Sequence, residues 1–309
     1  MSGHAGPVVV AATVNWNGYE DTVACVRTLE RSTHPLARVV VLDNGSTDGS
    51  GDRLERDLRP GVEVLRNPRN EGFASGANAC LRHALGAGAD LVFVVNNDTE
   101  VDPDCVRLLV EALASDPEAV VAGPAIFFHS RPDRVWQAGG SFSRWRAGVV
   151  VPGKGRRAAE LPSEPERVSF LTWCAVLVAR RALERVGSLD PAYYFYYEDV
   201  DFSLRVREAG MRMAFVPRAR VWHKIGDAAR DRTSPFVLYH LGRSCTLLFR
   251  KRFHGPYAWY GIALQYLLYT PHRLYQILRG GAGLESVRAW FQGLRDGARG
   301  REPSWRSPR

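Results

Sequence analysis

Short apolar runs alternate with stretches of helical length in the first part of this sequence. The apolar runs are residues 8–14, 37–43, 62–66, 90–95 and 119–123. The stretches of helical length between them are residues 19–32, 47–58, 72–86 and 103–115. This alternation is typical of a mainly parallel sheet flanked by helices. It predicts an α/β fold, and in such folds ligands bind at the carboxyl ends of the strands.

The regular alternation stops after residue 123. We expect an irregular extension of the sheet over residues 124–168, with a mobile loop at residues 152–166, which are rich in Pro, Gly and charge. Residues 169–179 resemble another buried strand. An amphipathic helix is then expected to follow Glu198 and to end at Gly210.

The last third of the chain is strongly basic. Residues 203–309 contain 20 Lys and Arg against 6 Asp and Glu, a net charge of +14 that leaves −6 on residues 1–202. We therefore divide the chain into an α/β domain over residues 1–235 and a basic, aromatic-rich helical extension over residues 236–309. Such a region suits anionic lipid or a phosphorylated substrate, and it contains no recognised nucleic-acid-binding module. Partial disorder is expected after Gly280.

Residues 257–270 are almost uncharged and rich in Trp and Tyr. They are too few to span a bilayer, which takes about 20 apolar residues. Two interpretations stay open. The segment is either a helix that lies in the interface of a membrane, or a helix that packs on the first domain or in a homodimer.

The five cysteines are far apart, odd in number and without a C-x-x-C pair. This spacing suggests neither a disulfide framework nor a zinc site, so a reducing cytoplasm is expected. The N-terminus has no basic segment before its apolar run, which argues against a signal peptide.

Short polar side chains stand at the ends of three predicted strands. Asn15 follows the first strand, Asp43 closes the second, and Asn96, Asn97 and Asp98 follow the fourth. Each group alone is an ordinary turn sequence. Acidic groups at neighbouring strand ends nevertheless require cationic or hydrogen-bonding partners, and a carboxylate oxygen such as that of Asp98 is a suitable ligand for Mg²⁺ or Mn²⁺.

Taken in order, these segments resemble the motif series of family-2 glycosyltransferases of the GT-A fold, rhamnosyltransferase-like subgroup. The matching segments cover about residues 8–250. They are VNWNG (14–18), VVVLDNGSTDGS (39–50), NPRNEGFASGAN (67–78), LVFVVNNDTEV (91–101), TWCAVLVARR (172–181), FYYEDVDFSLR (195–205) and HKIG (223–226). The resemblance implies that residues 1–235 form the catalytic domain.

The resemblance also implies a set of nucleotide-binding residues. Asn15 and Trp16 would line the nucleobase pocket, and Asp43 would accept a hydrogen bond from a pyrimidine ring. Around the turns that follow the strands, further residues would shape the site or lie near the phosphates; these are Asn44, Ser46, Asn70, Gly72 and Asn78.

A divalent metal, Mg²⁺ or Mn²⁺, follows from the same resemblance. Residues 96–98 stand where the family has its D-x-D motif, with an amide in place of the first carboxylate. Asn97 would then bond to a ribose hydroxyl, Asp98 would bind the metal, and His223 would be a second ligand. With two protein ligands, the site would be complete only when the donor is bound.

The ED motif implies an inverting transfer with Asp199 as the general base and Glu198 beside it. Read without the family pattern, Asp199 is simply an acid in the first turn of a helix, where the helix dipole keeps it ionised. Trp173, Cys174 and Tyr197 would lie near the sugar or the acceptor, although these aromatic residues suit a core equally well.

The expected donor is a nucleotide sugar, above all dTDP-rhamnose or another dTDP-deoxyhexose. A lipid-linked glycan, a polysaccharide end and a small molecule are open as acceptors, and the expected location is the cytoplasm, peripheral on the inner face of the membrane. The alternatives are a sugar nucleotidyltransferase, which would need a basic triphosphate loop that VNWNGYEDT lacks, and an inactive membrane-associated scaffold. A hydrolase with two catalytic carboxylates is disfavoured, because it needs no nucleotide pocket.

Overall fold

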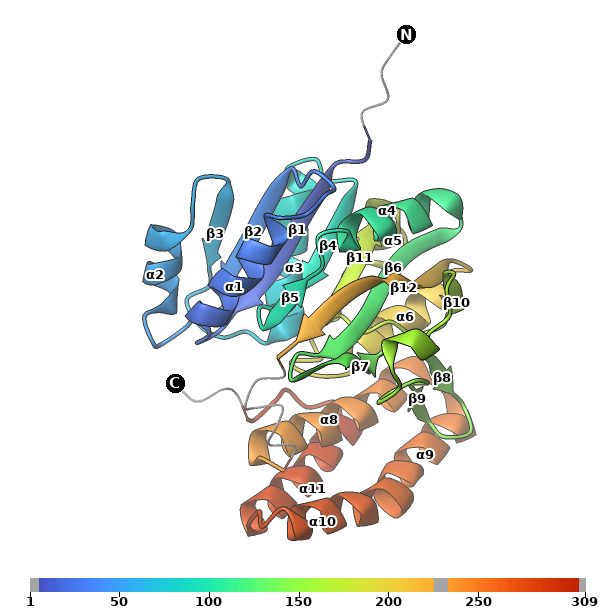
Figure 1. Ribbon diagram of the computed structural model, residues 1–309. Helices are drawn as coiled ribbons and strands as arrows, with labels where there is room; N and C mark the ends of the chain where they lie inside the picture. The colour runs from blue at the N-terminus through green and yellow to red at the C-terminus, as the bar shows by residue number, and fades with distance from the viewer. Residues whose placement is uncertain (1–5, 225–232, 306–309) are drawn as a thin grey trace.

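A mixed sheet of ten strands forms the centre of the protein in the computed structural model, which describes residues 6–224 and 233–305 (Figure 1). The strands are β1 (Val9–Asn15), β2 (Arg38–Asp43), β3 (Val62–Arg66), β4 (Leu91–Val95), β5 (Thr99–Val101), β6 (Ala119–Phe128), β7 (Arg131–Gln137), β10 (Glu166–Val168), β11 (Ala175–Ala179) and β12 (Arg212–His223). Their order is β10-β12-β6-β11-β4-β1-β2-β3, with β5 beside β12 and β7 beside β6. The predicted α/β fold is thus confirmed.

The helices follow the predicted alternation through the first domain. They are α1 (Tyr19–Leu29), α2 (Ser50–Asp57), α3 (Phe73–Gly86), α4 (Cys105–Ser115), α5 (Arg180–Val186) and α6 (Glu198–Glu208). Helices α1 and α3 cover opposite faces of the sheet. Successive side chains of a strand point to opposite faces, and two successive residues of β1 contact the two different helices. Asn15 bonds to Thr22 of α1, whereas Val14 lies against Gly76 of α3.

The segment 124–179 differs in part from the expectation. β6 runs on to Phe128 and pairs with β7, and the hairpin of β8 (Ser141–Ser143) and β9 (Gly148–Val150) follows. Residues 152–166 contain a short 3₁₀-helix, η1 (Ala158–Glu160), and lead into β10. The predicted strand at 169–179 begins only at Ala175, because β4 and β6 offer it partners over residues 175–179 alone.

The C-terminal region is a bundle of helices. It comprises α8 (Pro235–Arg252), α9 (Gly255–Leu264), the π-helical turn η2 (Gln265–Tyr269), α10 (Thr270–Arg279) and α11 (Leu284–Ala298). The partial disorder expected after Gly280 is wrong for residues 284–298, since α11 packs along α8 through Trp290 and Leu294. Within the described residues, none of the helices is long and apolar enough to cross a membrane.

Small residues let α8 and α11 approach closely. A Cβ atom added at Gly293 would fall on the backbone carbonyl of Tyr239, and one added at Gly297 would fall on that of Arg243. Because these contacts are with helix backbone, a side chain at either position could not be accommodated by a change of rotamer.

We expect Gly293→Ala to destabilise the protein. The added methyl group must push α11 away from α8, and overpacking of this kind costs about 1–3 kcal/mol, or about 2–10 °C in Tm for a chain of this size. Thermal unfolding followed by circular dichroism measures the effect. Gly86→Ala is the matched control, because nothing lies within 4 Å of its added Cβ. Equal melting temperatures for the two variants would contradict this packing.

Candidate active site

The ends of β1 and β2 share a buried polar cluster. Asn15 and Asp43 are paired in the parallel ladder, and the Asn15 amide donates to the Asp43 carboxylate at 2.8 Å and to the Ser46 hydroxyl at 3.1 Å. Asp43 is only 1% exposed, and it also accepts from the Ser46 hydroxyl and, at 3.3 Å, from its N–H. The carboxylate is therefore held rigidly at the carboxyl edge of the sheet, with Trp16 half-buried directly after β1.

Asn44 ties the next loop to the same edge. Its amide donates to the side chain of Asn70 at 3.1 Å and to the carbonyl of Gly72 at 3.2 Å. Gly72 has a φ of +84° at the start of α3, and a Cβ there would collide with Tyr194. These contacts fix a loop of residues 67–72 beside the end of β2, where the resemblance places the nucleotide.

The third polar strand end meets the end of β12. Asp98 follows β4, and its carboxylate lies 3.0 Å from Nε2 of His223, which is the last residue of β12. Asn97 points to the other side and donates to the hydroxyl of Thr22 at 3.0 Å. Asn97 and Asp98 thus have separate surroundings. Of the HKIG motif, Ile225 and Gly226 lie outside the described residues.

The pair Asp98 and His223 suits a divalent metal. Burial lowers the pKa of His223, whereas the neighbouring Cys174 sulfur and the Asp98 carboxylate raise it. The raising effects are larger, and the resulting pKa is about 10. A buried imidazole that holds its proton against a carboxylate marks a place where positive charge is stabilised, which a metal ion would also supply. Within the described ranges, no three His, Cys, Asp or Glu side chains gather into a metal centre, so oxygen atoms of a ligand would have to complete the shell.

Glu198 and Asp199 stand in the first turn of α6. Burial raises the pKa of Asp199 to about 6. Hydrogen bonds from the Val200 N–H, the Thr172 hydroxyl and the Trp173 N–H favour the charged form and limit this rise. Burial and the charge of Asp199 raise the pKa of Glu198 well above its usual value. The two acids therefore differ: hydrogen bonds hold the Asp199 carboxylate in place and favour its charged form, whereas the surroundings of Glu198 disfavour its charged form.

The segment around Cys174 connects these groups. The Cys174 carbonyl accepts from the Asn96 N–H at 2.8 Å, and its thiol, whose pKa is raised by burial, forms a hydrogen bond with His223. The two residues before it, Thr172 and Trp173, bond to the Asp199 carboxylate, so the metal candidates and the predicted base lie around one short segment.

Three of the predicted contact residues have partners within the protein. Trp173 is 2% exposed and packs edge-on against Phe202 at 5.0 Å, as the core interpretation of this residue predicts. Asn78 bonds through both polar atoms of its side chain to the backbone of Leu189. Tyr197 has a φ of +68° and packs against the C-terminal helices.

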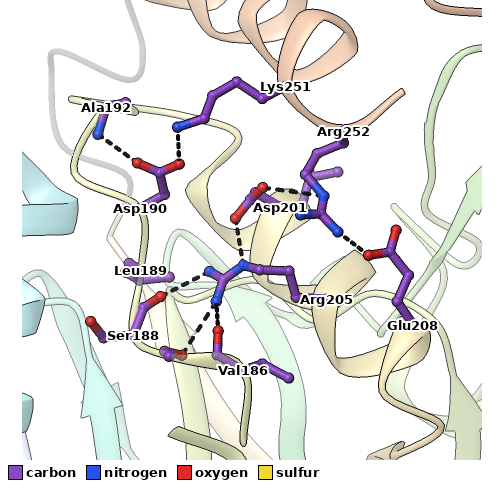
Figure 2. Close-up of polar contacts among 12 residues, drawn as sticks. Val186, Ser188, Leu189, Asp190, Ala192, Asp201, Arg205, Glu208, Lys251 and Arg252 are labelled. Atoms are coloured by element: carbon purple, nitrogen blue, oxygen red, sulfur yellow. Dashed lines mark hydrogen bonds and ion pairs between the residues drawn. The ribbon is translucent and has the colours of Figure 1, made fainter. Parts of the chain in front are cut away.

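Sequence reasoning missed the residues that anchor α6 and the segment before it (Figure 2). Asp201 is buried between Arg205 at 2.8 Å and Arg252 of α8 at 3.7 Å. Arg205 also donates to the carbonyls of Val186 and Ser188. The spacing of four residues between Asp201 and Arg205 was a signal in the sequence for their pairing.

Helix α8 holds the same segment from the other side. Lys251 pairs with Asp190 (Figure 2). Arg243 donates to the Ala192 carbonyl at 2.8 Å, and Ser244 donates to the Phe195 carbonyl at 2.9 Å. No local pattern in the sequence indicated these contacts, because their partners are about 50 residues apart. The loop that leads to Asp199 is therefore fixed by the C-terminal region.

The mixed sheet flanked by helices, with polar residues at the carboxyl edge, is the architecture of the GT-A glycosyltransferases. The profile described as "Glycosyl transferase family 2" matches residues 9–187, and the chain belongs to this family. Within the family it is rhamnosyltransferase-like.

Two relatives support this placement. One is the N-acetylglucosaminyl-diphospho-decaprenol L-rhamnosyltransferase of Mycobacterium tuberculosis, 30% identical over 69% of this chain and 75% of that protein. Another is the dTDP-rhamnosyl transferase RfbF of Shigella flexneri, 25% identical over 71% of this chain and 72% of that protein.

Solved structures share the fold at low sequence identity. GalNAc-T7 with UDP, GalNAc and Mn²⁺ has a TM-score of 0.58 at 20% identity, over 70% of this chain and 43% of that chain. The mannosyltransferase PcManGT from Pyrobaculum calidifontis, in complex with GDP-Man and Mn²⁺, has a TM-score of 0.57 at 16% identity, over 95% of this chain and 81% of that chain.

We expect Asn15→Asp to destabilise the protein by about 2 kcal/mol at pH 7, because two carboxylates would then share a buried site. Their repulsion raises the folded-state pKa of one of the two acids. The difference in free energy of unfolding between parent and variant should therefore be small near pH 4 and grow as the pH rises to 7. Thermal unfolding across this range measures it. Asn17→Asp, on an exposed neighbour, should cost little, and equal losses for both variants would contradict the cluster.

Proposed function

We propose that this protein transfers a deoxyhexose, rhamnose first among them, from a dTDP-activated donor to an acceptor hydroxyl with inversion at the anomeric carbon. The single observation that carries the proposal is the convergence of Asp98, His223 and Asp199 around Cys174 at the carboxyl edge of the sheet. The rhamnosyltransferase activity named for both relatives supports the choice of sugar, and the printed name of RfbF supports dTDP.

The nucleotide would bind across the ends of β1 and β2. Asp43 has a carboxylate fixed by Asn15 and Ser46, so it can accept from the ring N–H of a pyrimidine without reorganising. Trp16 would lie against the base, while Asn97 would bond to the ribose. Asn44, Asn70 and Gly72 shape the loop beside the phosphates through the hydrogen bonds described above.

Asp98 and His223 would hold a divalent metal, Mg²⁺ or Mn²⁺, together with oxygen atoms of the diphosphate. When bound, the metal would neutralise the charge that develops on the departing nucleotide. The two solved relatives of the fold contain Mn²⁺. Because residues 6–224 and 233–305 offer no third His, Cys, Asp or Glu ligand beside these two, we propose that metal and nucleotide bind together.

Asp199 would act as the general base. Its carboxylate is ionised above about pH 6 and oriented by the Val200 N–H and by residues 172 and 173. It would take the proton of the acceptor hydroxyl while that oxygen forms the new bond to the anomeric carbon and the nucleotide diphosphate leaves from the opposite face. Glu198, whose pKa is raised further by burial and by the charge of Asp199, would be the weaker candidate for this role.

The acceptor is proposed to be lipid-linked, because the name of the mycobacterial relative contains a diphospho-decaprenol acceptor. Peripheral attachment to the inner face of the membrane would bring the site to such a substrate. A glycan or a small-molecule acceptor is the alternative. We further propose that residues 1–235 and 236–309 work as a unit, because α8 anchors the loop before Asp199.

We expect kcat/KM to rise tenfold per pH unit up to about pH 6 and then to level off, because Asp199 must lose its proton to act as the base. Rates of rhamnose transfer between pH 5 and 8 measure this. Asp199→Asn should lower the rate by about 10² to 10⁴-fold. Glu198→Gln should keep the same rise of kcat/KM with pH below about pH 6. An active Asp199→Asn variant would leave a non-catalytic scaffold as the better interpretation.

Nucleotide binding tests the donor and the metal together. We expect dTDP with Mn²⁺ to raise Tm, by an amount that corresponds to about 2.7 kcal/mol at a hundred times Kd. GDP should raise it less. Asp98→Asn should lose the part of the shift that depends on Mn²⁺, while Asp133→Asn, exposed on β7, should keep it. The absence of a shift with any pyrimidine diphosphate would overturn the proposed donor site.

A further inference from the structure

Helix α9, the π-helical turn η2 and helix α10 expose a row of large apolar side chains. Pairs of them recur about every seven to eight residues, or two helical turns; the members are Trp259, Tyr260, Leu267, Leu268, Tyr275 and Leu278. Trp259, Leu267 and Leu278 are 72%, 76% and 75% exposed. The opposite face packs inward through Gly261, Gln265, Thr270 and Ile277. Soluble monomers rarely expose apolar patches of this size without a partner.

A second element joins this row from more than 100 residues away. The tip of the β8–β9 hairpin reads Arg144-Trp145-Arg146, and Trp145 is 88% exposed. Three tyrosine hydroxyls of the C-terminal helices donate to the three consecutive carbonyls of this tip: Tyr257 to residue 144, Tyr260 to residue 145 and Tyr269 to residue 146. Figure 1 shows the hairpin beside α9, at the border between the sheet and the C-terminal helices. We call the hairpin tip and the exposed row together the lower face.

The charge around the lower face is of one sign. From residue 233 to residue 284 the sequence contains no Asp or Glu. Arg144 and Arg146 flank Trp145, and Arg279 is exposed at the end of α10. Two copies of such a face would bring like charges together, whereas an anionic lipid surface would meet arginines at its headgroups and Trp, Tyr and Leu at its acyl chains.

We propose that the lower face docks on a bilayer that contains anionic phospholipid, with Trp145, Trp259 and Leu267 inserted at the depth of the headgroups. The two elements act together, because the tyrosine bonds hold the hairpin tip in line with α9. The helices lie on the membrane and do not cross it, in keeping with their length. The inference does not rest on the donor or the metal, so an experiment that excludes the proposed sugar transfer would leave it untouched.

Sedimentation of the full chain with vesicles tests the proposal. We expect binding to vesicles of 30% phosphatidylglycerol in phosphatidylcholine, at least tenfold weaker binding to pure phosphatidylcholine, and weaker binding at high salt. The double variants Trp145→Ala/Trp259→Ala and Arg144→Glu/Arg146→Glu should each lose at least tenfold in affinity. Arg185→Glu on α5, at the other end of the molecule, is the control and should bind as the parent does (Figure 1).

Folding and self-association are measured in parallel. Each variant must keep the parent's Tm and circular dichroism spectrum, and a variant that does not is replaced by Leu267→Ser/Leu268→Ser on the same face. Equal binding of parent and folded lower-face variants, or no binding to anionic vesicles, would overturn the proposal. A dimer in sedimentation equilibrium without lipid that is abolished by Trp145→Ala/Trp259→Ala would assign the face to a second copy instead.

Discussion

The antiparallel insertion of β11 between β4 and β6 is the constraint on which the site depends. Because β11 runs against β4, with Ala175 opposite Val95, the residues just before β11 come to lie beside those just after β4. The Asn96 N–H donates to the Cys174 carbonyl, and His223 pairs with Thr99 at the end of β12. Three segments about 50 to 75 residues apart in the sequence thereby place a thiol, a carboxylate and an imidazole together. No single one of these segments contains the site.

Buried polar groups at this edge are stable because almost every one has a partner. Asp43 is held by Asn15 and Ser46, which offsets the desolvation of a carboxylate that is nearly inaccessible to water. Among the described residues, two site atoms are exceptions: Oε2 of Glu198 and Nδ1 of His223 are each buried without a hydrogen-bond partner. Burial raises the pKa of Glu198 well above its usual value, whereas Asp199 next to it accepts several hydrogen bonds, so the two acids differ through their surroundings and not through their chemistry.

The C-terminal helices connect this site to the outside of the molecule. Helix α8 contacts the loop before Asp199 through Arg243 and Ser244. It also packs against α9, which forms part of the lower face. Arg243 is a buried arginine whose guanidinium bonds to backbone carbonyls of Ala192 and Arg301. The region that would bind the membrane is therefore also the region that holds the predicted base, which suits an enzyme whose acceptor is in a lipid surface.

The sequence by itself determined the α/β fold, the helices α1 to α4 and the polar strand ends, because these follow from local periodicity and from residue types at strand ends. It also placed Asp98, His223 and Asp199 through their motifs. It did not determine that Trp173 is core, that Asn78 braces Leu189, or that α11 is ordered, because each depends on packing partners distant in the chain. Only the tertiary structure decided which side chains have their hydrogen bonds and apolar contacts satisfied within the protein, and therefore which ones face a ligand.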